Sequence, residues 1–349
     1  MKSAYFLIPG DPETRTGGYL YDRRIVAGLR ELGWQIELRR LSAAFPLPDS
    51  ADLQDADAVL AALPEQALVV IDGLALGAMP SVVAAHRERL RLIGLVHHPL
   101  ALETGLDESR QQQLYASERE ALRQVRQIIV TSPSTARALA DYAVIPERCA
   151  VVLPGTDPAP LAVGSSGGEV ALLCAASLTL RKGHAVLFRA LAGLKQHQWR
   201  LRCAGSPTLD PVTAAGLQAL IYELELTERI ALLGELDTAA LAMSYHQADV
   251  FVLPSFHEGY GMVLAEALAR GLPIISTTAG AIPDTVPADA GLLVPPGDVA
   301  ALTEVLRRML EKPELRRELA AGARVARRTL PDWPQICARF AAALDTAPA

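Results

Sequence analysis

Short apolar runs alternate with longer helical patterns along the whole chain. The runs are continuously aliphatic and β-branched, which is typical of parallel strands buried on both faces. Repeated strand–helix alternation predicts an α/β protein with two Rossmann-like, doubly wound domains. Strands are expected at residues 4–10, 34–41, 67–73, 91–98, 127–132 and 149–155, and again at 170–177, 199–205, 229–235, 249–255, 272–278 and 291–297.

A segment poor in bulky aliphatic residues separates the two halves. Residues 157–169, DPAPLAVGSSGGE, are interpreted as a linker between an N-terminal domain (1–156) and a C-terminal domain (170–330). The tail at 331–349 has helical spacing and is expected to pack back on the N-terminal domain. Ligands of open α/β sheets bind beyond the carboxyl ends of the strands, so two such domains are expected to face a central cleft lined by strand-end loops.

Composition limits the classes of protein that fit this pattern. Of the 349 residues, 50% are hydrophobic and 21% are charged, so the chain can bury a large core. The net charge is −6 and neither half has a basic excess, which argues against a nucleic-acid partner. The four cysteines lie far apart without a CxxC pair and are interpreted as free thiols in a reducing compartment.

Membrane-related signals are weak. No apolar run approaches the roughly 18 residues of a membrane span, and the N-terminus lacks a signal-peptide pattern, so a cytoplasmic location is expected. The basic segment at 23–40, which contains Trp34, is compatible with peripheral membrane contact. Glu31 and Glu37 interrupt that segment, and a helix followed by a strand accounts for the same residues, so such contact is not favoured.

Glycines and histidines follow two strands of the first half. Gly17 and Gly18 open a helix whose bare amides suit an anion, although a flexible turn explains them equally well. His97 and His98 end the fourth run, and their rings point to opposite sides, so one can hydrogen-bond a ligand while the other packs. A metal site is disfavoured there because no HxxE, HxxH or cysteine partner lies nearby.

Two adjacent cations follow the first strand of the second half. Arg181 and Lys182 lie between this strand and an amphipathic helix. They are suited to binding phosphate oxygens, the lysine as a point charge and the arginine as a planar fork. A solvated basic loop is the alternative.

The most informative stretch is HEGYGMVLAE (257–266), directly after a predicted buried strand. Gly259 and Gly261 permit close backbone approach, and the amides that open the next helix point at whatever lies over its N-terminus. Glu258 precedes this helix and Glu266 lies on its second turn. A diphosphate at the helix N-terminus, flanked by two hydroxyl-bearing sugars, fits this arrangement.

Other interpretations of acidic pairs have less support. A glycosidase pair needs a raised pKa and a fixed separation around a water, neither of which the sequence indicates. Metal ligands would need further flanking Asp or His residues, and only His257 is present. The DxD at Asp55 and Asp57 lies in a predicted helix with solvated acids and is discounted.

The second half resembles the retaining glycosyltransferases of family 4, which have the GT-B fold of two Rossmann-like domains. The hallmark E-x7-E is matched by Glu258 and Glu266. The first half matches less strongly, through the Gly17–Gly18 loop, the strand-end histidine and SPSTARAL. The second-half resemblance covers roughly residues 170–310 through LTLRKGHAVLFRAL, WRLRCAG, ERIALLGEL, ADVFVLPSFHEGYGMVLAEALARGLPIISTTAGAIPDTV and AGLLVPPGD.

This resemblance implies roles for individual residues. Glu258 resembles the glutamate that contacts donor-sugar hydroxyls near the reacting carbon, and Glu266 the one that holds the nucleotide ribose. Lys182 would be the phosphate cation. His97 would lie near the donor sugar, with His98 as the alternate because the doublet leaves the alignment ambiguous by one residue. The further donor-binding residues are Arg181, Gly259, Tyr260, Gly261, Met262, Val263, Gly17, Gly18 and Gly205.

One departure from the family concerns charge. Many members carry a Gly-Arg pair shortly before the lysine, where this chain reads Ala175-Ala176-Ser177. Neutralisation of the departing diphosphate would then depend on Lys182, Arg181 and helix amides.

The resemblance implies a retaining, metal-independent transfer of a sugar from a nucleoside-diphosphate sugar to an acceptor hydroxyl, without a cofactor. A non-catalytic nucleotide-sugar-binding protein and a nucleotide-sugar epimerase-hydrolase of the same fold are the alternatives. An NAD-dependent enzyme is disfavoured because no GxGxxG follows a strand. The sequence leaves the donor base, the donor sugar and the acceptor open.

Overall fold

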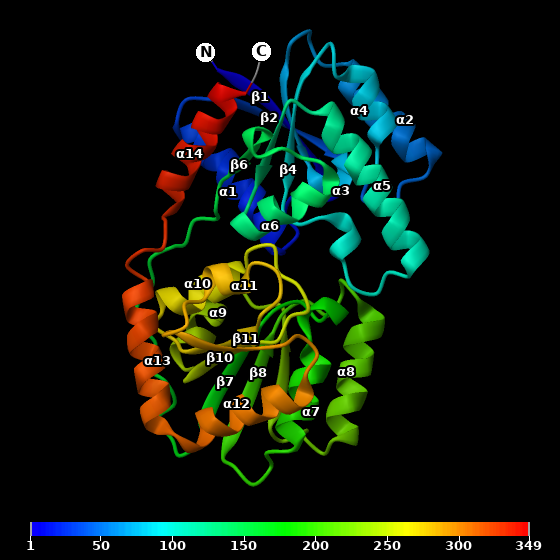
Figure 1. Cartoon of the computed structure of the whole chain (residues 1–349). Coiled ribbons are helices and arrows are strands. Elements are labelled where there is room, and N and C mark those ends of the chain that lie inside the picture. The colour runs from blue at the N-terminus through cyan, green and yellow to red at the C-terminus, as the bar shows by residue number, and fades with distance from the viewer. Residues whose placement is uncertain (1, 348–349) are drawn as a thin grey trace. The chain divides into compact units, whose positions relative to one another are not determined.

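The computed structural model describes residues 2–347, which divide into two compact units (Figure 1). The N-terminal unit contains the chain up to Gly155 together with the segment from Pro331 onward. The C-terminal unit is Thr156–Leu330.

The N-terminal unit is built on a six-stranded parallel sheet of order β2-β1-β3-β4-β5-β6. The direction of strand addition reverses between β1 and β3, which creates a switch point at the carboxyl ends of these two strands. The strands are β1 (Ser3–Pro9), β2 (Gln35–Leu41), β3 (Leu68–Asp72), β4 (Arg91–Val96), β5 (Gln127–Val130) and β6 (Cys149–Val151).

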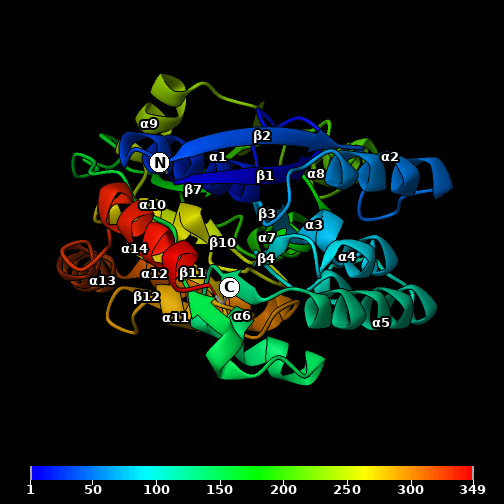
Figure 2. The ribbon, with the colours of Figure 1, turned by 90° about the horizontal axis from the view of Figure 1, so that it is seen from above.

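Helices cover both faces of this sheet. The helices α1 and α14 lie side by side on one face (Figure 1), and α2, α4 and α5 gather on the other side (Figure 2). The helices are α1 (Gly17–Glu31), α2 (Ser50–Ala61), α3 (Gly73–Leu76), α4 (Pro80–His86), α5 (Glu108–Gln124), α6 (Pro133–Ala138) and α14 (Trp333–Thr346), with short 3-10 turns η1 (Leu100–Leu102), η2 (Leu139–Tyr142) and η3 (Pro146–Arg148).

The helix α1 shows how the sequence positions this layer. Its apolar residues recur at helical spacing, so Tyr21, Ile25 and Leu29 are fully buried against the sheet. Asp22 lies on the same buried face with 1% of its surface exposed, which is an exception to the amphipathic pattern. A buried carboxylate requires a partner, and that partner lies at the switch point described below.

The C-terminal helix completes the core of the N-terminal unit. The rings of Phe340 and Phe6 lie 5.9 Å apart, and those of Trp333 and Tyr21 lie 6.0 Å apart. Gly28 gives α14 room, because a Cβ at this position would lie 2.2 Å from Sγ of Cys337.

The C-terminal unit has a second six-stranded parallel sheet, of order β12-β11-β10-β7-β8-β9. Its switch point lies between β7 and β10, which are neighbours in the sheet although about 75 residues separate them in the chain. The strands are β7 (Val170–Ala175), β8 (Trp199–Ala204), β9 (Ile230–Gly234), β10 (Val250–Leu253), β11 (Ile274–Thr277) and β12 (Gly291–Val294).

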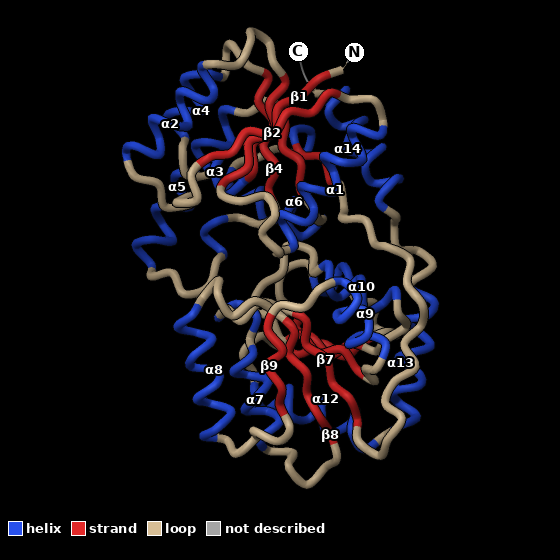
Figure 3. The backbone as a smooth tube through the Cα atoms, turned by 180° about the vertical axis from the view of Figure 1, so that it is seen from behind, coloured by secondary structure: helices blue, strands red, loops and turns tan. Residues whose placement is uncertain are grey.

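Helices again cover both faces of the sheet. In Figure 3, α7 and α8 lie on one side of this unit, and α9, α10 and α13 lie on the other. The helix α12 packs against α7. The elements are α7 (His184–Ala192), α8 (Pro211–Glu223), α9 (Thr238–His246), α10 (Met262–Ala269), α11 (Ile282–Thr285), α12 (Val299–Glu311) and α13 (Pro313–Ala326), with η4 (Leu180–Lys182).

The predicted doubly wound α/β architecture is confirmed in both units, and each of the twelve predicted runs contains a strand. Eleven of these strands end before their runs do, because pairing stops where the chain turns into a strand-end loop; β2 ends together with its run, at Leu41. His97 and His98 therefore lie beyond β4 instead of inside it.

The segment interpreted as a linker contacts the C-terminal unit. The amide of Ala162 donates to the carbonyl of Arg270 at 2.9 Å, and the amide of Val163 donates to that of His246 at 2.9 Å. The amide of Ser165 donates to Oδ1 of Asp249 at 3.1 Å. These hydrogen bonds tie the extended segment to the ends of α9 and α10.

The structure also bears on the expectations about membrane contact and about the cysteines. Trp34 has 7% of its surface exposed and packs inside the N-terminal unit, so its ring is not presented to a lipid surface. No helix in the described part of the chain is both long enough and apolar enough to cross a membrane. All four cysteines are free thiols, as predicted.

Candidate active site

The switch point of the C-terminal unit brings together two motifs that are far apart in the sequence. Arg181 and Lys182 lie in η4 after β7, and residues 257–261 form the loop after β10. Because β7 and β10 are adjacent parallel strands, both loops leave the same edge of the sheet side by side.

Glu258 is the centre of this cluster and has 6% of its surface exposed. Lys182 Nζ donates to Glu258 Oε1 at 2.7 Å, and Ser255 Oγ donates to the same oxygen at 2.6 Å. Arg181 Nη1 lies 3.6 Å from the other oxygen, Oε2. Burial alone would raise the pKa of Glu258, but the two cations lower it to about 2.

This environment decides between two chemistries for Glu258. A carboxyl group with a pKa of about 2 is ionised at any neutral pH, so it accepts hydrogen bonds and cannot act as the proton donor of a glycosidase pair. The sequence pattern assigned Lys182 and Arg181 to phosphate oxygens. The structure shows that both also contact Glu258, leaving one net positive charge on the three side chains.

Hydrogen bonds to backbone carbonyls hold the loop after β10 in place. The amide of Phe256 donates to the carbonyl of Arg181 at 2.8 Å, and the Arg181 guanidinium donates to the carbonyl of His257 at 2.8 Å. The amide of Ala281 donates to the carbonyl of Glu258 at 2.8 Å. The loop after β10 is therefore fixed from both sides before any ligand binds.

Two glycines permit this close approach. Gly183 has φ +70°, and a Cβ on it would lie 2.1 Å from the carbonyl oxygen of Pro254. Gly261 has φ +85° and is the N-cap of α10, so Met262 and Val263 open that helix. Amides in the first turn of a helix favour an anion, which is the role predicted for this part of the loop.

Tyr260, another predicted donor-binding residue, has a fixed backbone and a partly exposed side chain. The carbonyl of Tyr260, the residue after Gly259, accepts a hydrogen bond from Thr285 Oγ1 at 2.7 Å. Burial raises the pKa of the Tyr260 hydroxyl to about 12, so the phenol stays protonated. The side chain is half-buried and can donate a hydrogen bond.

Glu266 lies on α10 in a different environment. Tyr245 Oη donates to Glu266 Oε2 at 3.1 Å, and the Arg270 guanidinium lies 4.3 Å from the centre of the Tyr245 ring. Burial raises the pKa of Glu266 above its usual value, and Arg270 only partly offsets this. Tyr245 was not identified from the sequence, because a single tyrosine on an apolar helix reads as a core residue.

Gly205, a predicted donor-binding residue, has a packing role in this structure. Its amide donates to the carbonyl of Gly234 at 2.8 Å. A Cβ at this position would lie 1.8 Å from the carbonyl oxygen of Ala176, so only glycine fits there. Its N–H already donates to the backbone carbonyl at the end of β9 and is not free to bind a donor.

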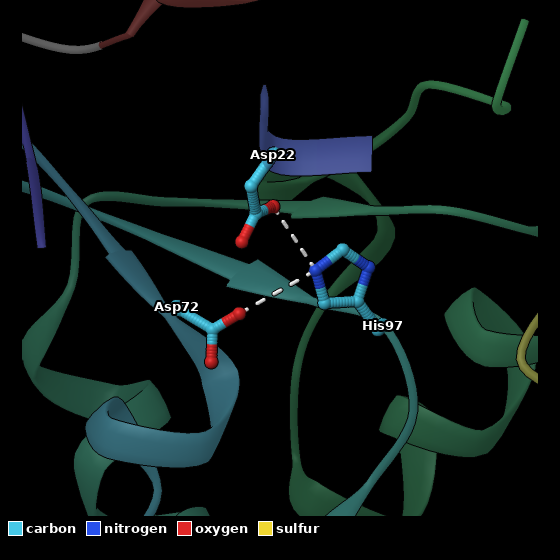
Figure 4. A group of neighbouring side chains, drawn as sticks. All are labelled: Asp22, Asp72 and His97. Atoms are coloured by element: carbon cyan, nitrogen blue, oxygen red, sulfur yellow. Dashed lines mark hydrogen bonds and ion pairs between the residues drawn. The ribbon is translucent and has the colours of Figure 1, made fainter. Parts of the chain in front are cut away.

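The switch point of the N-terminal unit carries a second polar cluster, shown in Figure 4. His97, after β4, directs Nε2 toward Asp22 Oδ1 at 3.2 Å and Asp72 Oδ2 at 3.5 Å. Gly18 lies over the ring, because a Cβ there would be 3.3 Å from His97 Cδ2. Gly17 is the first residue of α1, which carries Asp22.

The two histidines of the doublet are thereby distinguished. His98 directs its Nε2 to Oε2 of Glu103 at 3.3 Å and does not join the aspartates. His97 is the residue that the structure places at the switch point. Asp22 and Asp72 were missed in the sequence, although an aspartate on the buried face of a helix and one at the end of an apolar strand are both unusual positions.

Two acidic features bear on metal binding. Donor atoms of Asp22, Asp72 and His97 lie within 4.8 Å of one another, so this group could hold a metal ion. The sequence disfavoured a metal site at His97 because no partner is nearby in the chain, but the two aspartates come from α1 and β3. The DxD lies on α2, where Asp57 Oδ1 accepts from Nε2 of His86 at 2.8 Å and Asp55 is exposed.

Two doubly wound units in one chain, each with a six-stranded parallel sheet, have the architecture of the GT-B class of α/β proteins. Two family models match consecutive parts of the chain. "Glycosyltransferase Family 4" matches residues 14–160, and "Glycosyl transferases group 1" matches residues 162–326. The chain belongs to this glycosyltransferase family, family 4.

Named relatives agree with this assignment. MMP alpha-(1->4)-mannosyltransferase of Mycolicibacterium hassiacum is 29% identical over 341 residues, which cover 91% of this chain and 80% of that protein. Phosphatidyl-myo-inositol mannosyltransferase of Mycobacterium leprae is 34% identical over 170 residues, which cover 48% of this chain and 43% of that protein.

Solved structures show the same fold. Sucrose-phosphate synthase of Thermosynechococcus elongatus superposes with a TM-score of 0.81 at 22% identity, covering 98% of both chains. HepE of Anabaena in complex with UDP-glucose superposes with a TM-score of 0.78 at 17% identity, covering 98% of this chain and 99% of that one.

Proposed function

We propose that this glycosyltransferase transfers a sugar, with retention of anomeric configuration and without a metal ion, from a nucleoside-diphosphate sugar to an acceptor hydroxyl. The observation that carries the proposal is the convergence of Arg181, Lys182 and Glu258 beside the N-terminus of α10. Cations and helix amides supply positive potential for a diphosphate, and the ionised carboxylate supplies an acceptor for sugar hydroxyls.

The chemistry follows from where charge develops. The bond between the anomeric carbon and the diphosphate oxygen breaks, and negative charge accumulates on the leaving group. Lys182, Arg181 and the first amides of α10 stabilise that charge. The acceptor oxygen bonds to the anomeric carbon on the same face, and its proton passes to the leaving phosphate, so no separate base is needed.

The two motif glutamates take different parts of the donor. Glu258 stays ionised between its cations and accepts hydrogen bonds from the sugar that reacts. Glu266, held by Tyr245, accepts from the ribose hydroxyls. The relative with bound UDP-glucose supports a nucleotide-sugar as the donor class, and the named mannosyltransferases support a hexose as the transferred group. A reducing, cytoplasmic setting stays a prediction supported by the free thiols.

A nucleotide-sugar panel tests the donor. The protein is heated with each of a set of nucleoside diphosphates and their hexose conjugates, including UDP-glucose and GDP-mannose. A ligand at about 100 times its Kd is expected to stabilise the fold by about 2.7 kcal/mol. Absence of stabilisation by every member would contradict the donor class.

Product analysis tests the reaction. The donor found in the panel is incubated with EDTA-treated protein and candidate hydroxyl acceptors, and the product anomer is assigned by NMR. Retention and full activity in EDTA are expected. Inversion would refute the mechanism, loss of activity restored by Mn²⁺ or Mg²⁺ would refute metal independence, and release of free sugar without acceptor would identify an epimerase-hydrolase. Binding without turnover for every acceptor would favour a non-catalytic binding protein.

A further inference from the structure

The imidazole of His97 is held on several sides by the N-terminal unit. Nε2 points at two carboxylates, those of Asp22 on α1 and Asp72 at the end of β3 (Figure 4). The edge of the Tyr21 ring packs against the imidazole with centroids 5.4 Å apart, and Gly18 leaves room for Cδ2.

The backbone of His97 is fixed as well. Its carbonyl accepts hydrogen bonds from the hydroxyls of Thr131 at 3.2 Å and Thr135 at 3.3 Å. Asp72 is in turn fixed through Oδ1, which accepts from the amide of Leu74 at 2.8 Å. The direction of the ring is therefore determined by the protein before substrate binds.

Two buried carboxylates opposite one imidazole favour its cationic form. Asp22 and Asp72 have 1% and 4% of their surfaces exposed, so their charges are weakly screened. Burial alone would lower the pKa of His97, but Asp22 and Asp72 raise it to about 10. Burial raises the pKa of Asp22 to about 6, with the His97 charge opposing the rise.

We propose that Asp22 is a positioning residue that, with Asp72, holds His97 as an imidazolium whose Nδ1–H donates a hydrogen bond to a substrate oxygen. Nε2 faces the carboxylates and Nδ1 points away from both of them (Figure 4). An imidazolium has no lone pair, so His97 does not take the acceptor's proton. The identity of the substrate in this inference rests on the proposed function. The protonation state of the His97 ring does not.

Asp22 also destabilises the fold through its second carboxylate oxygen, which is not expected of a residue with a purely structural role. Among the described residues, no group donates to its buried Oδ2. A buried acceptor left without a donor is destabilising. Asp22→Asn keeps an oxygen for the Nε2–H and removes the buried charge, so it is expected to leave the unfolding midpoint unchanged or higher while changing the titration of His97.

The first experiment is a pH titration of the His97 ring by ¹⁵N NMR in the full-length protein without ligand. In the wild type, both ring nitrogens are expected to stay protonated from pH 6 to above 8. In Asp22→Asn, and in the matched variant Asp72→Asn, the pKa is expected to fall toward the ordinary value of about 6.5. A wild-type ring that titrates near 6.5 would overturn the proposal, whatever reaction the protein catalyses.

The second experiment is the pH dependence of kcat/KM with the donor from the nucleotide-sugar panel. In Asp22→Asn, activity is expected to fall as pH rises through the lowered pKa of His97, because the neutral ring can lose its Nδ1 proton. A general base would give the opposite sign, with activity rising over the same interval, and that result would overturn the proposal. An unchanged profile would also overturn it.

The third experiment separates the ion pair from a metal site. Mn²⁺ added to the wild-type protein is expected to leave the ¹⁵N signals of His97 sharp, because the cationic ring has no lone pair for a metal. Selective broadening of His97 at micromolar Mn²⁺, lost in Asp22→Asn, would replace the proposal with a metal site on the same three side chains.

Discussion

Replacing Glu258 by glutamine removes a charge that the C-terminal unit holds between two cations. The pKa of this carboxyl is lowered from the ordinary 4.5 to about 2. At 1.36 kcal/mol for each pKa unit, this difference corresponds to about 3 kcal/mol of stability at pH 7. The amide oxygen of glutamine still accepts from Lys182 and Ser255, so about 3 kcal/mol is the upper bound of the expected loss.

Glu266→Gln is the matched control, because it makes the same chemical change eight residues further along. Burial raises the pKa of Glu266, so the folded state disfavours its charge. The glutamine oxygen can keep the hydrogen bond from Tyr245. Glu266→Gln is therefore expected to leave the free energy of unfolding unchanged or to increase it.

Urea denaturation of the wild type and both variants measures these differences. The charge of Glu258 contributes its full stability above pH 4.5, and this contribution is lost as pH falls toward about 2. The gap between wild type and Glu258→Gln is thus expected to be largest at pH 7 and smaller at pH 3. Equal losses in the two variants, or a gap that does not change with pH, would refute the electrostatic reasoning.

Three further substitutions, one of them a control, test the packing and the polar contacts around the donor site. Gly183→Ala is expected to cost about 2 kcal/mol of unfolding free energy or more, since a side chain is strained at φ +70° and its Cβ would lie 2.1 Å from the Pro254 carbonyl oxygen. Gly167→Ala has nothing within 4 Å and is expected to stay within about 0.5 kcal/mol of wild type in the same urea assay; equal effects would contradict the packing argument. Tyr245→Phe removes the hydroxyl that holds Glu266 and is expected to weaken nucleoside-diphosphate binding by about 1 kcal/mol in titration calorimetry, while an unchanged Kd would remove this pair from the nucleotide site.

The doubly wound architecture could be predicted because its signal is local. Continuous apolar runs mark strands buried on both faces, and all twelve runs contain strands. The strand order could not be read in the same way. It was the adjacency of β7 and β10 that placed Lys182 against Glu258, two residues whose ion pair spans 76 positions in the chain.

The sequence predicted those site residues that belong to a recognisable motif of residue types and spacing. Glu258 and Glu266 stood out by their spacing and glycines, but the opposite shifts of their pKa values depend on neighbours from other elements. The sequence could not decide whether His97 or His98 lies at the switch point, because this depends on which ring faces Asp22 on α1. Asp22 was hidden for the same reason, because its partner follows a strand 75 positions later in the chain.

The path of the chain sets the order in which its two cores can form during synthesis. The C-terminal unit, Thr156–Leu330, is contiguous and can fold as soon as it has left the ribosome. The N-terminal unit is made before it but lacks α14 until Trp333–Thr346 have been synthesised.

Until then, the face of the first unit around Phe6 and Tyr21 has no cover from Phe340 and Trp333. A nascent chain halted before Pro331 would therefore present an apolar surface that attracts chaperones or other nascent chains. The core of the N-terminal unit can therefore be completed only after the whole of the C-terminal unit has been synthesised.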